Sequence, residues 1–151
     1  MKDNNGKFKT FGTVILVIVL LLMLLVGIHF LNPLTHSNNS VKKYVLRTIP
    51  IGTTYDEVLK ITEKKGWEIE YENENRGLMV IVSEDRAIYY DDYELDAINE
   101  NPNLRISGSK SLQVLLGEYY NPFPAAVYAW MVFDDQGKMT ELFISRDIDG
   151  I

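Results

Sequence analysis

Residues 51–71, IGTTYDEVLKITEKKGWEIEY, contain a predicted helix and most of the predicted strand that follows it. Thr54 and Glu57 have the Thr-x-x-Glu spacing of a capping box, which satisfies the first unpaired amides of a helix. Apolar residues then recur at helical spacing until Gly66, a residue type that commonly ends helices. Over residues 67–72, Trp, Ile and Tyr alternate with glutamates, which predicts a strand with its aromatic side inward and its carboxylates in water.

The chain beyond this helix and strand reads as antiparallel β-structure. Leu78–Val82 is apolar enough for a central strand, and a turn over residues 73–77 would pair it with residues 67–72. Leu112–Leu116 predicts a further strand. Between them, residues 83–103 read as a loop with room for one short strand or helix.

The clearest hairpin lies near the C-terminal end. Residues 126–133 and 139–145 are two apolar runs joined by Asp134–Lys138, in which Gly137 suits the left-handed conformation that such loops need. Together with the capped helix, these strands predict an α+β domain in which one main helix packs on an antiparallel sheet of about four strands.

An uncharged apolar segment precedes the domain. Residues 12–31, GTVILVIVLLLMLLVGIHFL, contain no Asp, Glu, Lys or Arg, and a helix of 20 residues is long enough to cross a bilayer. Lys2, Lys7 and Lys9 precede the segment, whereas the next basic residue is Lys42. The positive-inside bias therefore predicts a cytoplasmic N-terminus. A buried core helix is the alternative, but no other segment could surround a helix this apolar.

The same pattern also describes a cleavable signal peptide. After Val26, however, the chain lacks a clear pair of small residues at the spacing that cleavage requires, so an uncleaved anchor is favoured. We therefore expect a cytoplasmic N-terminus over residues 1–11, a transmembrane helix over 12–31, a flexible tether over 32–40 and an extracytoplasmic domain over 41–151. This organisation predicts a single-pass protein of the cell membrane.

Composition narrows the chemistry of the domain. The chain has no cysteine, which excludes disulfides, thiolate nucleophiles and cysteine zinc sites. Its two histidines, His29 and His36, lie in the apolar segment and in the predicted tether, so no catalytic triad is expected in the domain. After residue 31, 12 Lys and Arg stand against 20 Asp and Glu, a net charge near −8. Such a charge argues against nucleic acid as a partner and favours a basic protein surface.

Two acidic tracts could supply oxygen ligands to calcium. The first contributes the weak candidates Asp91, Asp92, Glu94 and Asp96. The second is Asp147-Ile-Asp149-Gly150 at the C-terminal end. Neither has the spacing of an EF-hand loop, so a solvated loop is the favoured interpretation, and we expect no metal site and no cofactor.

Aromatic residues at the end of a predicted strand are the best candidates for a binding surface. Tyr119 and Tyr120 are adjacent, so only one of them can point inward from a strand and the other should be exposed. Phe123 follows between two prolines, and Trp130 and Phe143 lie on the neighbouring hairpin. Aromatic side chains of this kind often anchor protein partners, although packing beneath the loop is the alternative. We expect these five residues to form a protein-binding surface.

A capped helix followed by antiparallel strands also resembles a known family. The phrase IGTTYDEV at Ile51–Val58 and the hairpin at Trp130–Lys138 are similar to segments of small envelope lipoprotein domains of the SmpA/OmlA (BamE) kind, whose wider group includes β-lactamase-inhibitor-like domains. This resemblance implies an α+β scaffold that binds other proteins and catalyses nothing. The chain departs from the family in having no lipid-bearing cysteine, no obvious second helix directly after the first, and an acidic segment in its middle.

The sequence therefore predicts a membrane-anchored, extracytoplasmic module that is not an enzyme and that binds another envelope or exported protein. Two alternatives stay open. One is an enzyme or calcium-dependent domain that uses the acidic loop over residues 84–100. The other is an immunity protein against an exported toxin, in which the acidic domain would mask a basic partner.

Overall fold

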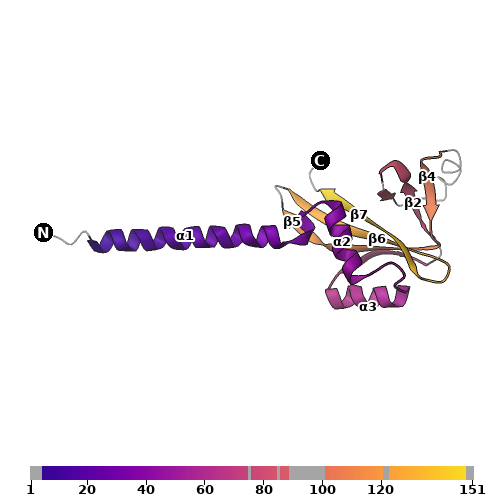
Figure 1. Ribbon diagram of the computed structural model, residues 1–151, viewed down its shortest axis with the longest axis horizontal. Coiled ribbons are helices and arrows are strands. Elements are labelled where there is room, and N and C mark those ends of the chain that lie inside the picture. Colours follow the sequence, from indigo (N-terminus) through magenta and orange to yellow (C-terminus); the bar gives the residue numbers. More distant parts are fainter. Residues whose placement is uncertain (1–4, 75, 85, 89–100, 121–122, 149–151) are drawn as a thin grey trace.

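The computed structural model of the protein describes residues 5–74, 76–84, 86–88, 101–120 and 123–148. Its helices are α1 (Asn5–Leu31), the short 3-10 helix η1 (Pro33–Thr35), α2 (Asn38–Thr48), α3 (Tyr55–Lys65) and the 3-10 helix η2 (Val82–Glu84). Its strands are β1 (Glu68–Asn73), β2 (Leu78–Ile81), β3 (Arg86–Ile88), β4 (Leu104–Ser107), β5 (Lys110–Tyr120), β6 (Pro124–Phe133) and β7 (Met139–Ile148). The fold is α+β, and Figure 1 shows α1 extending away from a domain that the other elements form.

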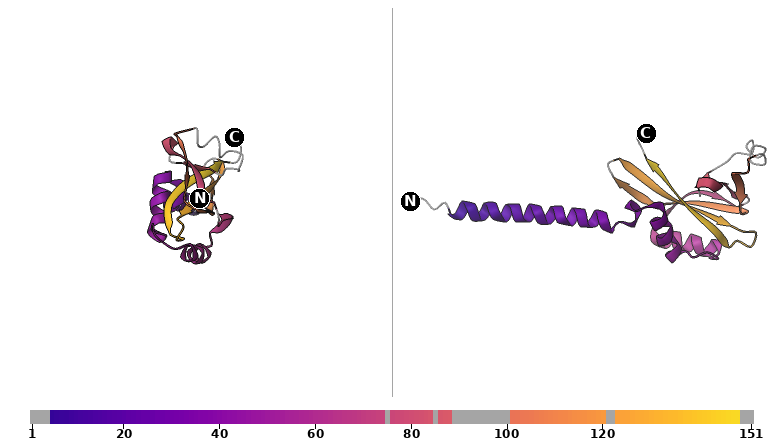
Figure 2. Two further views of the ribbon diagram at one scale, coloured as in Figure 1. Left: turned by 90° about the vertical axis from the view of Figure 1, so that its right-hand side faces the viewer. Right: turned by 45° about the horizontal axis from the view of Figure 1, so that its top comes forward.

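Two antiparallel sheets and a layer of helices make up this domain. The larger sheet has the strand order β1-β5-β6-β7, and the smaller sheet has the order β3-β2-β4. The helices η1, α2 and α3 pack on one face of the larger sheet, and the smaller sheet lies against part of the opposite face (Figures 1 and 2). The larger sheet is therefore the central layer, and both of its faces bury apolar side chains.

Each face of the larger sheet has its own apolar core. In the helix-side core, Val41 and Val45 of α2 pack with Phe133 of β6, and all three side chains are fully buried. The sheet-side core consists of Leu78, Val80, Ala87, Trp130, Val132 and Phe143. Because successive residues of a strand face opposite sides, β6 supplies apolar side chains to both cores.

The capped helix is confirmed as α3. The Thr54 backbone N–H donates to a carboxylate oxygen of Glu57 at 3.1 Å, and the Thr54 hydroxyl donates to the same oxygen at 2.9 Å. At the other end, Gly66 takes the left-handed conformation, with φ of 67°. Both termini therefore follow from the local sequence, in which a capping box starts the helix and a glycine stops it.

The C-terminal hairpin is confirmed as β6 and β7, and Gly137 in its loop has φ of 72°. We expect Gly137→Val to lower the free energy of unfolding by about 1–2 kcal/mol, because positive φ brings the Cβ of an L-residue against its own backbone. The matched control is Gln136→Val at an exposed position of the same loop. Thermal unfolding checks the prediction, and equal melting temperatures for the two variants would show that the loop conformation is misassigned.

Strand pairing differs from the prediction in the first half of the domain. β2 does not pair with β1; it lies between β3 and β4 in the smaller sheet, while β1 pairs with β5. The regular alternation predicted for residues 67–72 is also interrupted, because the register of β1 shifts between Ile69 and Tyr71. As a result Trp67 packs against the helix-side core, Tyr71 packs against the sheet-side core, and Ile69 is 39% exposed.

Residues 32–40, predicted as a flexible tether, instead belong to the domain. The Asn32 side chain accepts from the Leu34 N–H at 3.0 Å and caps η1, and Ser37 caps α2. Leu34 lies in the helix-side core. The domain therefore has a second main helix, α2, because Val41 and Val45 recur four residues apart and form a buried face.

The apolar helix predicted over residues 12–31 lies within α1, where the large apolar side chains from Val14 to Leu24 are 40–66% exposed. The structure contradicts the transmembrane part of the fold prediction: no helix in the described ranges is both long enough and apolar enough to cross a membrane.

Candidate protein-binding surface

The five aromatic residues predicted to form one binding surface lie in three different environments. Tyr120 and Phe123 are exposed, by 71% and 53%. Tyr119 is partly buried against the helix-side core. Trp130 and Phe143 are buried in the sheet-side core, at 8% and 3% exposure. Only Tyr120 and Phe123 therefore remain as a surface, which we call the β5–β6 tip.

Trp130 and Phe143 are a cross-strand pair inside the domain. They lie opposite each other in the ladder between β6 and β7. The Trp130 Nε1–H donates to the Ser145 hydroxyl at 2.9 Å, which satisfies the one polar group of the indole. Their place in the predicted surface is therefore corrected, because the smaller sheet packs against this face of the hairpin and both rings are buried.

A register shift in β5 determines which of the two adjacent tyrosines is exposed. Without it, the alternation that places Val114 and Leu116 in the helix-side core would also direct Tyr120 to that side. The register shifts between Leu115 and Gly117, so that Tyr119 takes the inner position. Tyr120 then faces away from the helices, which confirms the prediction that one of the pair is exposed.

The β5–β6 tip lies at the end of the domain from which α1 extends. Tyr120 is opposite Pro124, the first residue of β6, so the tip lies where β5 ends and β6 begins. Both views of the ribbon place this end of β5 and β6 on the side nearest α1 (Figures 1 and 2). A Cβ at Gly117 would come 3.0 Å from the Leu34 side chain, which shows how closely η1 approaches β5 behind the tip.

Arg146 holds η1 and α2 at this end of the domain, and no local pattern in the sequence predicts this role. Its guanidinium donates to the Leu34 carbonyl at 3.0 Å, to the Asn38 side-chain oxygen at 2.7 Å and to the His36 carbonyl. It also lies 5.8 Å from the ring centroid of Tyr119. Tyr119 therefore contacts the side chain that holds η1 in place. Arg146 is more than 100 residues from its partners in η1 and α2, so no local sequence pattern predicts these contacts.

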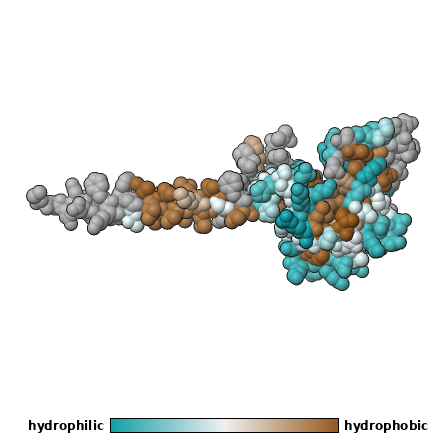
Figure 3. Space-filling model, in the orientation of Figure 1, coloured by the Kyte–Doolittle hydropathy of each residue, from teal (hydrophilic) through white to brown (hydrophobic). Residues whose placement is uncertain are grey.

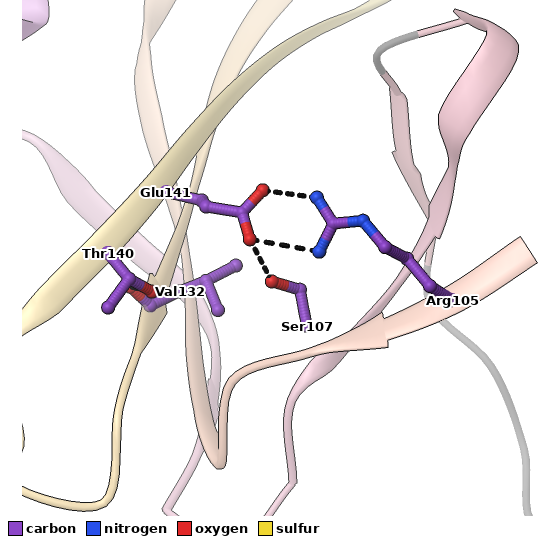
Figure 4. Close-up of polar contacts among 5 residues, drawn as sticks. All are labelled: Arg105, Ser107, Val132, Thr140 and Glu141. Atoms are coloured by element: carbon purple, nitrogen blue, oxygen red, sulfur yellow. Dashed lines mark hydrogen bonds and ion pairs between the residues drawn. The ribbon is translucent and has the colours of Figure 1, made fainter.

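A carboxylate of β7 joins the larger sheet to the smaller one. Glu141 accepts from Arg105 of β4 at 2.9 Å and 2.5 Å, one bond to each carboxylate oxygen, and also from the Ser107 hydroxyl (Figure 4). The hydrogen bond from Arg105 is the main reason why the pKa of Glu141 lies below its usual value. Partial burial raises this pKa, and the hydrogen bond from Ser107 lowers it further. This cluster holds the two sheets together.

We expect the stabilising effect of Glu141 to depend on pH. A carboxyl group whose pKa is lower in the folded state stabilises the fold above its unfolded pKa of about 4.3, and this contribution is lost as the pH falls through the folded pKa. Glu141→Gln should therefore lower the free energy of unfolding by about 1 kcal/mol at pH 7 and by less at pH 3. Urea denaturation at the two pH values, with exposed Glu118→Gln as control, measures the difference. A deficit of equal size at both would refute the assigned role.

A second carboxylate on the predicted wet face of β1 has a structural partner. The Tyr55 hydroxyl donates to Glu72. Burial of the phenol raises the pKa of Tyr55, and the hydrogen bond from Tyr55 to Glu72 raises it further. Tyr55 also packs edge-on against Phe133, with ring centroids 4.9 Å apart. The shift in pKa therefore arises from contacts that attach α3 to the sheet.

The weak metal candidates Asp91, Asp92, Glu94 and Asp96 lie outside the described residues. So do Asp149 and Gly150 of the second acidic tract, whereas Asp147 is exposed in β7. Within the ranges that the structure covers, no group of three or more His, Asp or Glu side chains is placed to hold a metal ion. The calcium alternative accordingly stays a prediction.

No family model matches the chain, and no curated protein or solved structure matches it. The resemblance to envelope lipoprotein domains of the SmpA/OmlA (BamE) kind therefore stays a prediction from the sequence.

Proposed function

We propose that the domain is a non-catalytic protein-binding module and that the β5–β6 tip is its contact surface. The observation that carries the proposal is the pair of large aromatic side chains, Tyr120 and Phe123, left exposed at one hairpin end. Aromatic residues are enriched among the few residues that dominate protein interfaces. The tip rests on a rigid base, since Arg146 and the packing of η1 hold the strands behind it.

The charge of the domain bears on the partner. Lys and Arg number 12 after residue 31, against 20 Asp and Glu, so a partner with a basic surface would approach favourably. An exported or envelope protein with a basic surface would fit the proposal as the partner. If that partner were a toxin, the domain would act as its immunity protein. The position of the domain outside the cytoplasm stays a prediction, and an active alkaline phosphatase fusion at its C-terminal end would support it.

The proposal is tested by capture of a partner after crosslinking in cells. The double variant Tyr120→Ser, Phe123→Ser should reduce capture by more than tenfold, since an anchoring aromatic contributes about 1–3 kcal/mol and tenfold corresponds to about 1.4 kcal/mol. Because both side chains are exposed, the variant should melt close to wild type.

The matched control replaces two exposed apolar residues of the smaller sheet and its flank, Val82→Ser and Ile106→Ser, which are 52% and 42% exposed. We expect this control to capture the partner as wild type does. Equal capture by a stably folded tip variant would show that the β5–β6 tip is not the contact surface.

A further inference from the structure

α1 leaves the domain without lying against it. Its large apolar side chains from Val14 to Leu24 are 40–66% exposed and stand clear of the domain in Figure 3. A Cβ at Gly27 would meet no heavy atom within 4 Å, so this side of the helix is also clear of the domain near its end at Leu31. Among the described side chains of α1, none belongs to either apolar core. The direction of α1 therefore depends on the residues that follow it.

A single residue, Asn32, connects α1 to η1. Its side-chain oxygen accepts from the Leu34 N–H at 3.0 Å, and its carbonyl accepts from the Thr35 hydroxyl at 2.9 Å and from the Thr35 N–H at 3.2 Å. The ring of Pro33 disfavours the helical conformation at the residue before it, and Asn32 has extended backbone angles, with φ of −75° and ψ of 111°. Asn32 is therefore held by η1 and does not rotate as a free linker residue would.

The segment that contains η1 is bonded in turn to β7. Asn38, the first residue of α2, accepts from Arg146 at 2.7 Å through its side-chain oxygen and donates to the Ile144 carbonyl at 3.3 Å through its side-chain nitrogen. Arg146 also donates to the carbonyls of Leu34 and His36. One side chain of β7 thus binds this segment at three of its residues, and Leu34 anchors it in the helix-side core.

We propose that residues 32–38, which we call the η1 joint, are a rigid connection that fixes the direction of α1 relative to the domain, and that Arg146 holds this joint in place. A flexible tether over residues 32–40 would have a root-mean-square length of about 15–18 Å and would let the domain turn about the end of α1. The η1 joint removes this freedom. The β5–β6 tip therefore keeps one position relative to α1.

This inference does not depend on whether the β5–β6 tip binds a partner, because the direction of α1 is a property of the chain alone. Its test needs no ligand, and failure of one proposal leaves the other standing. A rigid joint with no partner at the tip, and a partner at the tip of a swinging domain, are distinguishable results.

Distances between two spin labels, one on α1 and one on the domain, test the joint. The chain has no cysteine, so Leu20→Cys and Lys64→Cys, both at exposed positions, label the full chain at two defined places. Pulsed electron–electron double resonance in detergent should give a single narrow distance distribution. Arg146→Ala should widen it by about twofold or more, because the segment then regains the freedom of a linker. Arg47→Ala, which removes an exposed arginine from the last turn of α2, is the matched control and should leave the width unchanged.

A second pair of labels, Lys64→Cys with Asp135→Cys, lies within the domain and shows whether each variant stays folded. If Arg146→Ala disturbs this pair as well, the double variant Asn32→Gly, Pro33→Gly decides, because it frees the backbone of the joint and removes no side chain from either core. It should widen the distances between α1 and the domain and leave the second pair unchanged. A broad distribution in the labelled chain without these substitutions, or an unchanged width in a folded joint variant, would overturn the proposal.

Discussion

Phe133→Ala is expected to destabilise the domain by about 3–5 kcal/mol, because it removes a fully buried ring from the helix-side core. Phe133 lies at the end of β6, where its ring meets that of Tyr55 at an interplanar angle of 74°. Loss of the ring leaves a cavity between α3 and the sheet. The cavity cannot collapse easily, because the backbones of the helix and of the sheet are held in place by their own hydrogen bonds. A domain of this size has a total stability of only about 5–15 kcal/mol, so a large part of it should be lost.

Phe123→Ala is the matched control, since it removes the same atoms from a side chain that is 53% exposed. We expect it to change the free energy of unfolding by no more than about 0.5 kcal/mol. Urea denaturation of the two variants measures both values. A Phe123→Ala variant as unstable as Phe133→Ala would mean that the β5–β6 tip is buried and unavailable to a partner.

Gly77→Ala should lower stability by at least about 3 kcal/mol, because the added methyl group has no room. A Cβ at this position would lie 2.0 Å from the Ser107 carbonyl oxygen and 2.3 Å from that of Gly108. Both atoms are backbone, so they can move only if the strand moves. Gly77 immediately precedes β2, whose first residue pairs with Ser107 of β4, and the expected result is separation of these two strands.

Gly27→Ala in α1 is the control for this substitution, because a Cβ there would meet no heavy atom within 4 Å. Alanine is also the better helix former, so no loss is expected. Thermal unfolding gives the stability of each variant, and hydrogen exchange at β2 and β4 shows whether the smaller sheet has opened. If hydrogen exchange at β2 and β4 is unchanged in Gly77→Ala, Gly77 does not lie as close to the Ser107 carbonyl as the structure places it.

Local signals in the sequence predicted the elements whose boundaries depend on a few neighbouring residues. The capping box at Thr54 and Glu57 and the glycine at 66 define α3, and Gly137 defines the final hairpin. The buried positions Val41 and Val45 carried a similar signal for α2, but the polar residues before them favoured a tether. Ser37 turned out to be the helix cap among those polar residues.

Pairing between distant strands had no such local signal. Residues 67–72 and 78–82 follow each other in the sequence, yet they belong to different sheets. The candidate surface was limited in the same way. Alternation predicted that one of Tyr119 and Tyr120 would be exposed, but only the register shift after Leu115 determines which one. Burial of Trp130 depends on the smaller sheet, whose position the sequence did not predict.

Site-specific photocrosslinking tests the β5–β6 tip most directly as a protein-binding surface. A photoreactive phenylalanine analogue replaces Tyr120 or Phe123, both aromatic and exposed, and in separate controls it replaces Val82 or Ile106. Irradiation of cells should yield the same crosslinked partner from positions 120 and 123 and none from the two control positions. No adduct at either tip position, or the same adduct from all four positions, would contradict the proposed function.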